Sequence, residues 1–91
     1  MKTWDEYKDF VKTTDPEEAK EMEEIEELAR IVGAVIDRRG ELGLSQRDLA
    51  ALCALPQSSI ARFESGRKSP NLTTLIRILQ PLGLKLAVVE A

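Results

Sequence analysis

Apolar residues recur at helical spacing through the first half of the chain. Five apolar residues are spaced alternately three and four positions apart: Met22, Ile25, Ala29, Val32 and Ile36. Such a stripe is typical of an amphipathic helix. Asp15 is a good N-cap, Pro16 fits the first helical position and Gly40 suits the C-cap. We therefore expect one long helix, roughly Pro16–Arg39.

Three shorter helices are predicted after it. Ser45 caps the first, Gln46–Cys53, and the second is Pro56–Ser65, which a glycine ends. Asn71 caps the third, Leu72–Leu82, where a proline and a glycine stop the helix. Cys53 lies on the apolar side of its helix, so we expect it to be a core residue.

The two ends of the chain carry patterns of their own. Residues 4–12 place four apolar side chains at helical spacing: Trp4, Tyr7, Phe10 and Val11. A helix this short is marginal in water, so it must dock on something to be ordered. The tail alternates with a period of two, which predicts a β-strand with one shared face: Leu84, Leu86 and Val88. A lone strand needs a partner, and we expect the same strand of a second copy to supply it.

Composition excludes most enzyme mechanisms. Of 91 residues, 43% are hydrophobic and 32% are charged, the balance of one globular domain. There is no histidine and only one cysteine, which removes imidazole catalysis, an intrachain disulfide and a Cys-rich zinc site. No apolar run approaches the ~20 residues that span a bilayer, and no signal-peptide core is present. We expect a cytoplasmic protein that is not an enzyme, binds no membrane and needs no metal or cofactor.

Charge divides the chain near residue 27. Residues 1–27 hold four Lys and eleven Asp or Glu, a net charge of −7, and residues 28–91 hold nine Lys or Arg and five Asp or Glu, a net charge of +4. An acidic arm suits a basic partner, and a basic body suits a polyanion. Glu-rich helices are also simply soluble, so charge alone leaves both interpretations open.

The two short helices around Ala54 have the pattern of a helix-turn-helix, whose second helix enters the DNA major groove. Gln46 supplies a phosphate donor at the start of the first helix, and Ala54 is the small turn residue. Ile60 and Phe63 are the inward anchors of the second helix. Four residues face outward from it: Gln57, Ser58, Ala61 and Arg62.

These segments resemble the phage-repressor (Cro/C1, or XRE) family. The matching stretches are LSQRDLA at residues 44–50 and QSSIARFESGR at residues 57–67, followed by Pro70. The resemblance implies a five-helix domain over residues 28–83 that binds operator DNA as a homodimer. It places Gln46, Ser59 and Ser65 at the DNA backbone, and it implies that Glu64 pairs with Arg47.

Two positions depart from the family pattern, and they affect the insertion angle of the second helix. Pro56 replaces the usual Ser or Thr cap, and Ala54 replaces the usual turn glycine. Ala54 must either adopt a left-handed conformation at modest cost or form a different turn.

Side-chain chemistry supports the roles at the DNA. Arg62 can donate two bonds to guanine and Gln57 can bond adenine, while Ala61 suits a thymine methyl. Arg67 and Lys68 follow directly and are placed for phosphates, which give affinity without sequence information. Each of these residues is also compatible with an ordinary solvated surface.

The acidic extension and the tail resemble the layout of HigA-type antitoxins. That resemblance implies a small basic partner of the RelE/HigB type, an mRNA-cleaving toxin, and repression of the shared operon at a palindromic operator. Aromatic residues are enriched in binding hot spots, so the four apolar residues of segment 4–12 are the candidate toxin contacts. The alternative is that these side chains fold back on the chain's own long helix.

We therefore expect an all-α fold: a helix-turn-helix domain at residues 28–83, an acidic extension at 1–27 and a dimerising strand at 84–91. The preferred function is an autoregulating antitoxin. A stand-alone repressor of phage or restriction-modification type is the alternative. A third possibility is a pure protein-interaction inhibitor that no longer binds DNA, but the outward Gln57 and Arg62 argue against it.

Overall fold

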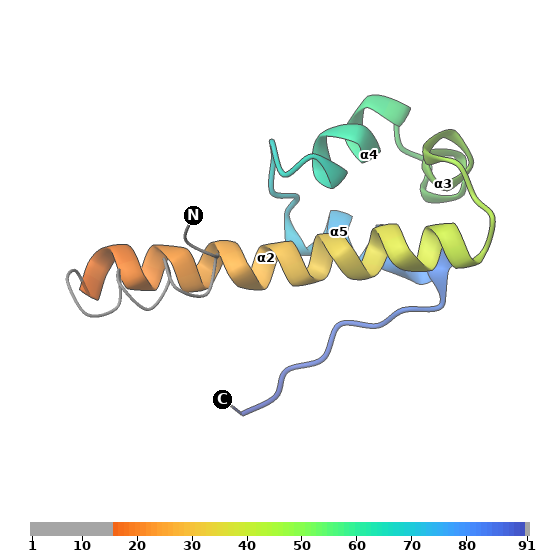
Figure 1. Ribbon diagram of the computed structural model, residues 1–91. Coiled ribbons are helices and arrows are strands. Elements are labelled where there is room, and N and C mark those ends of the chain that lie inside the picture. Colours follow the sequence, from red (N-terminus) through yellow and green to blue (C-terminus); the bar gives the residue numbers. More distant parts are fainter. Residues whose placement is uncertain (1–15, 91) are drawn as a thin grey trace. The chain divides into compact units, whose positions relative to one another are not determined.

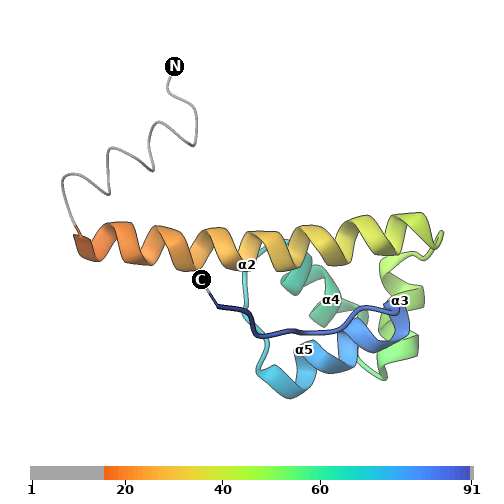
Figure 2. The same cartoon turned by 90° about the horizontal axis from the view of Figure 1, so that it is seen from below.

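The computed structural model describes residues 16–90. They form four α-helices and one 3-10 helix: α2 (Pro16–Glu41), α3 (Gln46–Cys53), α4 (Gln57–Glu64), α5 (Leu72–Leu79) and η1 (Gln80–Leu82) (Figures 1 and 2). The structure divides into two compact units, and the boundary falls between Arg30 and Ile31, inside α2. No helix of residues 16–90 combines the length and the apolar character that crossing a membrane requires.

The long helix α2 starts where the sequence predicts and ends two residues later than predicted. Acidic residues occupy its first turn and two arginines its last, in agreement with the helix dipole. The helix passes through Gly40 as far as Glu41, and the chain turns at Gly43, whose φ is 69°. A glycine adopts this left-handed conformation at little cost, so Gly43 rather than Gly40 is the turning point.

The first unit contributes the N-terminal half of α2. Arg30 forms ion pairs one turn back along the helix, with Glu26 at 2.5 Å and with Glu27. Ala19 and Met22 are buried side chains of the same stretch. The acidic half of α2 is therefore a well-formed helix with a charged surface.

The second unit has a core to which every helix contributes. Its buried residues are Val35, Leu49, Ala50, Cys53, Ile60, Phe63, Leu75, Ile78, Leu79 and Leu82. α3 and α4 pack closely against each other within this core. The prediction that Cys53 is a core residue is confirmed, and burial raises the pKa of its thiol.

The helix starts show the predicted caps. The Ser45 hydroxyl accepts a bond from the Asp48 N–H at 3.0 Å, and the Asp48 carboxylate accepts one from the Ser45 N–H at 2.9 Å, which completes a capping box for α3. The Asn71 side chain accepts a bond from the Thr74 N–H at 2.8 Å and so caps α5. α4 starts at Gln57, one residue later than predicted. Pro56 is its N-cap, has an extended backbone and forms no side-chain hydrogen bond to the helix.

The five-helix count and the C-terminal strand are not found in residues 16–90. The predicted helix Leu72–Leu82 ends as an α-helix at Leu79 and continues as the 3-10 helix η1, since Pro81 has no N–H to extend the α-helical ladder. Residues 84–90 have no regular secondary structure. A strand needs a hydrogen-bonded neighbour, and a single chain offers the tail none.

Candidate nucleic-acid interface

The candidate interface centres on α4, whose residues divide into two faces. Ile60 and Phe63 are buried in the core and anchor the helix. Gln57, Ser58 and Arg62 are exposed, as expected for residues that would face DNA bases. The two further candidates on this helix, Ser59 and Ala61, are half-buried.

The turn between α3 and α4 takes the first of the two forms that the sequence leaves open, with a left-handed Ala54. Ala54 has φ 55° and ψ 43°. Its N–H donates to the Ala51 carbonyl at 3.2 Å, and the Leu55 N–H donates to the Ala50 carbonyl at 2.9 Å. The chain therefore leaves α3 in a tight, hydrogen-bonded turn, which fixes where α4 begins.

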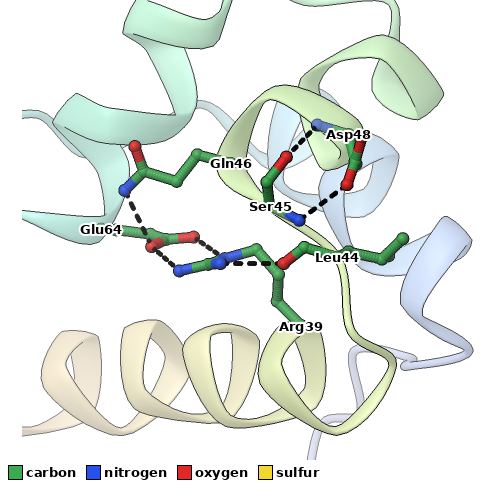
Figure 3. Close-up of polar contacts among 6 residues, drawn as sticks. All are labelled: Arg39, Leu44, Ser45, Gln46, Asp48 and Glu64. Carbon is green, nitrogen blue, oxygen red and sulfur yellow. Dashed lines mark hydrogen bonds and ion pairs between the residues drawn. The ribbon is translucent and has the colours of Figure 1, made fainter.

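A hydrogen-bonded network joins α2, α3 and α4 (Figure 3). The Arg39 guanidinium donates to the two carboxylate oxygens of Glu64, from Nε to Oε2 and from Nη2 to Oε1, each at 2.8 Å. Gln46 Nε2 donates to Glu64 Oε1 at 3.1 Å, and Arg39 Nη1 donates to the Leu44 carbonyl at 2.9 Å. The Glu64 side chain is only 6% exposed, so these bonds compensate for the burial of its charge.

This network corrects one prediction, because the partner of Glu64 is Arg39 and not Arg47. In the sequence, Arg39 stands only as the predicted last residue of the long helix. A signal was present, since Arg39 lies four and seven residues after Val35 and Val32 and so continues the inward stripe of α2. A cation on an inward stripe needs a partner, and Glu64 is that partner.

The candidate DNA-backbone residues lie in two groups. Gln46 is half-buried, and its amide is oriented by Glu64 while keeping a second N–H to donate. The Ser65 hydroxyl donates to the Arg62 carbonyl at 3.0 Å, so Ser65 also helps to end α4. Arg67 and Lys68 are exposed and make no ion pair with any residue in the described part of the chain.

A cleft of about 230 Å³ adjoins the outward face of α4. It lies between this helix, the loop that follows it and the start of α5. Three of the DNA-contact candidates line it: Ser59, Arg62 and Lys68. Further polar side chains come from Ser69, Asn71 and Thr74. No carboxylate is among its lining residues, so the cleft adds to the cationic character of this surface.

The remaining site predictions concern the two ends of the chain and metal binding. The candidate toxin contacts Trp4, Tyr7, Phe10 and Val11 lie outside the described residues. In the tail, Leu84 and Leu86 are half-buried against the core, whereas Val88 is fully exposed. Residues 16–90 contain no group of three potential metal ligands.

Comparison with known proteins identifies relatives of the whole chain and of its core. A helix-turn-helix family matches residues 35–89. A solved structure described as a toxin-antitoxin module from Streptococcus pneumoniae is 34% identical, with a TM-score of 0.74, and the match covers 100% of this chain and 96% of that chain.

Two curated proteins are similar over shorter stretches. An uncharacterized HTH-type transcriptional regulator of Haemophilus influenzae is 41% identical over 59 residues, which are 65% of this chain and 60% of that protein. Antitoxin HigA1 of Mycobacterium tuberculosis is 33% identical over 75 residues, which are 82% of this chain and 50% of that protein. The chain therefore spans 60% and 50% of the length of these two relatives.

Proposed function

The chain belongs to the helix-turn-helix family, and on that premise we propose that it is a DNA-binding antitoxin. In this proposal α4 reads a palindromic operator in the cytoplasm, and the acidic N-terminal extension holds a small basic toxin. The operator lies in the protein's own operon, so that the antitoxin represses its own synthesis and that of the toxin.

The observation that carries the antitoxin proposal is the extent of the similarity beyond the helix-turn-helix. The family match covers 55 residues, from 35 to 89. The match to the pneumococcal toxin-antitoxin module covers the whole chain, and the match to antitoxin HigA1 covers 75 residues. At least 20 residues of the HigA1 match therefore lie outside the family match. A bare repressor domain does not account for this additional similarity.

The DNA half of the proposal is supported by the exposed face of α4. Arg62 suits a guanine and Gln57 an adenine, with Ser58 and Ala61 beside them. Gln46, Ser59, Ser65, Arg67 and Lys68 surround this face as candidate phosphate contacts. The Arg62 guanidinium makes no ion pair with residues 16–90, so its donors are available to a base.

The proposed binding of a toxin is supported by the negative charge of the N-terminal extension. Residues 1–27 carry a net charge of −7. A toxin of the RelE/HigB type that holds RNA phosphates needs a basic surface, and opposite charge speeds the encounter of such partners. Trp4, Tyr7, Phe10 and Val11 would supply the apolar contacts, since aromatic residues are enriched among binding hot spots.

The homodimer is supported by apolar surface that the second unit leaves exposed. Leu72 and Ile76 are 71% and 43% exposed on α5, and Val88 and Val89 are exposed on the tail. Leu72 and Ile76 lie one turn apart on the same helix, and contiguous exposed apolar surface marks interaction sites. In the proposed homodimer, which pairs two copies through this surface, the two α4 helices must lie about one DNA turn, ~34 Å, apart to contact the two halves of a palindrome. Sedimentation should then give a dimer for the natural chain and a monomer for Ile76→Asp.

The test of the antitoxin proposal is co-purification. The full chain is compared with a variant in which Trp4, Tyr7 and Phe10 are all alanine, each carrying an affinity tag and expressed in the source cell. We expect a small basic protein to elute with the natural chain and to be lost from the variant, while both retain operator DNA. If both elute without a protein partner, the toxin half is wrong.

A stand-alone repressor is the alternative, and one comparison favours it. The Haemophilus relative is described as a transcriptional regulator and matches 59 residues at 41% identity. Under this alternative the same purification gives DNA without any protein partner. The two functions are therefore separated by one experiment.

A further inference from the structure

Arg47 lacks the partner that the sequence assigns to it. Glu64 Oε1 accepts bonds from Arg39 and from Gln46, and Glu64 Oε2 accepts one from Arg39. Both carboxylate oxygens therefore have donors from other residues. The guanidinium of Arg47 is left out of this network.

No other carboxylate in residues 16–90 takes the place of Glu64. Residues three and four positions away on a helix are the natural partners of a side chain, and around Arg47 they are Gly43, Leu44, Ala50 and Ala51. The adjacent Asp48 is engaged in the capping box, where its carboxylate accepts the Ser45 N–H. Arg47 is exposed and forms no ion pair with the described residues.

The position of Arg47 places this exposed cation next to Gln46, a residue of the candidate interface. It directly follows Gln46, whose side chain reaches across to Glu64 at the end of α4. Successive helix residues are about 100° apart around the axis, so Arg47 lies to one side of Gln46. Its exposure shows that it points away from the core residues Leu49 and Cys53 of the same helix.

We propose that Arg47 binds a DNA backbone phosphate next to the phosphate contact of Gln46. The proposal rests on the DNA binding proposed above and adds a contact from α3 to it. A guanidinium pairs well with phosphate oxygens, and such a contact adds affinity without adding sequence preference. Arg47, Arg62, Arg67 and Lys68 then form a series of unpaired cations along α3, α4 and the loop that follows.

The experiment measures how DNA affinity depends on salt. The probes are one duplex that the full natural chain selects from random-sequence DNA and one scrambled duplex of the same length. The natural chain is compared with Arg47→Ala, with Arg47→Lys and with Arg77→Ala, a matched control that removes an exposed arginine from α5. Thermal unfolding of each variant shows that the fold is kept.

We expect Arg47→Ala to weaken binding to both duplexes by the same factor. The slope of log affinity against log salt should become shallower by about one unit for each bound copy. Arg47→Lys should keep the natural slope, because a lysine also neutralises a phosphate, and Arg77→Ala should change nothing.

Two results overturn the proposal in different ways. If the natural chain binds DNA and Arg47→Ala keeps the natural slope, Arg47 does not contact phosphate and the proposed function stands. If the natural chain selects no duplex at all, the proposed DNA binding fails and the Arg47 contact fails with it.

Discussion

Arg39 and Glu64 form a two-point ion pair that joins the end of α2 to the end of α4. Both bonds measure 2.8 Å, and the side chains are 19% and 6% exposed. The hydrogen bond to Glu64 raises the pKa of the Arg39 guanidinium, which favours its charged form. Two parallel hydrogen bonds between a planar guanidinium and a carboxylate also fix the relative orientation of the two side chains. The pair therefore helps to fix the orientation of α4 relative to the end of α2.

The first prediction is that Arg39→Ala strongly destabilises the fold. It leaves the Glu64 carboxylate buried with Gln46 as its one remaining side-chain donor, and removing one partner of such a pair costs about 3 kcal/mol. The midpoint of thermal unfolding should fall by more than about 10 °C in a domain of this size. Circular dichroism during heating measures this midpoint for the variant and for the natural chain.

Arg47→Ala is the control for this experiment, since the family resemblance would give Arg47 the same structural role. We expect its unfolding midpoint to stay within about 2 °C of the natural chain, as for other surface changes. Equal losses for Arg39→Ala and Arg47→Ala would contradict the pairing.

The second prediction concerns the left-handed Ala54. A residue with a Cβ in this conformation costs about 1–2 kcal/mol, and part of that cost disappears with glycine. After the larger entropy of an unfolded glycine is subtracted, Ala54→Gly should stabilise the fold by about 0.5–1 kcal/mol. Ala51→Gly, inside α3, is the matched control and should instead destabilise it by about 1 kcal/mol. Chemical unfolding in urea measures both, and a loss for both variants would refute the account.

The third prediction is a pH dependence at the start of α3. Hydrogen bonds from the Ser45 backbone and side chain, with a smaller effect of the Arg47 charge, lower the pKa of Asp48. A carboxyl with a lowered folded pKa stabilises the protein above its unfolded pKa of about 3.9, and the contribution is lost as the pH falls through the folded pKa. Asp48→Ala should therefore unfold at a lower temperature than the natural chain at pH 7.

The difference between the unfolding midpoints of Asp48→Ala and the natural chain should narrow progressively below about pH 4, as the carboxyl becomes protonated first in the unfolded state and then in the folded state. Unfolding curves from pH 7 to pH 2 give the profile. A constant difference over that range would mean that the Asp48 charge does not support the capping box.

The fourth prediction separates the two kinds of DNA contact. Arg62→Ala should cost about 1–3 kcal/mol of binding and relax the preference at one base pair. Arg67→Ala should weaken all sequences alike and make the salt slope shallower by about one unit for each bound copy. Competition binding with single-base variants of the selected duplex measures both. An equal loss on every sequence for Arg62→Ala would remove it from the base-reading residues.

Local signals in the sequence predicted most of the fold. The Ser45 cap of α3, the Asn71 cap of α5 and the start of α2 at Pro16 all depend on residues within a few positions of one another. For Ala54 the sequence left two turns open, and the structure has the left-handed one. The exposure of Gln57, Ser58 and Arg62 also followed from helical periodicity, and their contacts with DNA stay predictions.

The two incorrect predictions, the partner of Glu64 and the C-terminal strand, depend on contacts between residues that are far apart in the sequence. Glu64 lies 25 residues from Arg39, and an arginine is available at both 39 and 47, so spacing along the chain does not choose between them. In the tail, Leu84 and Leu86 alternate as a strand would, but in the single chain they pack against the core. An alternating pattern predicts that one side of the segment is buried, but it does not identify the surface that buries it.

The two faces of α4 have a consequence for how such proteins diverge. Ile60, Phe63 and Glu64 make the helix's contacts with the fold, whereas Gln57, Ser58 and Arg62 are exposed. Substitutions at exposed positions of this kind usually change stability by less than about 0.5 kcal/mol. Substitutions at the outward positions therefore leave the scaffold unchanged, so related proteins can differ in the chemistry of this face while they keep the same fold.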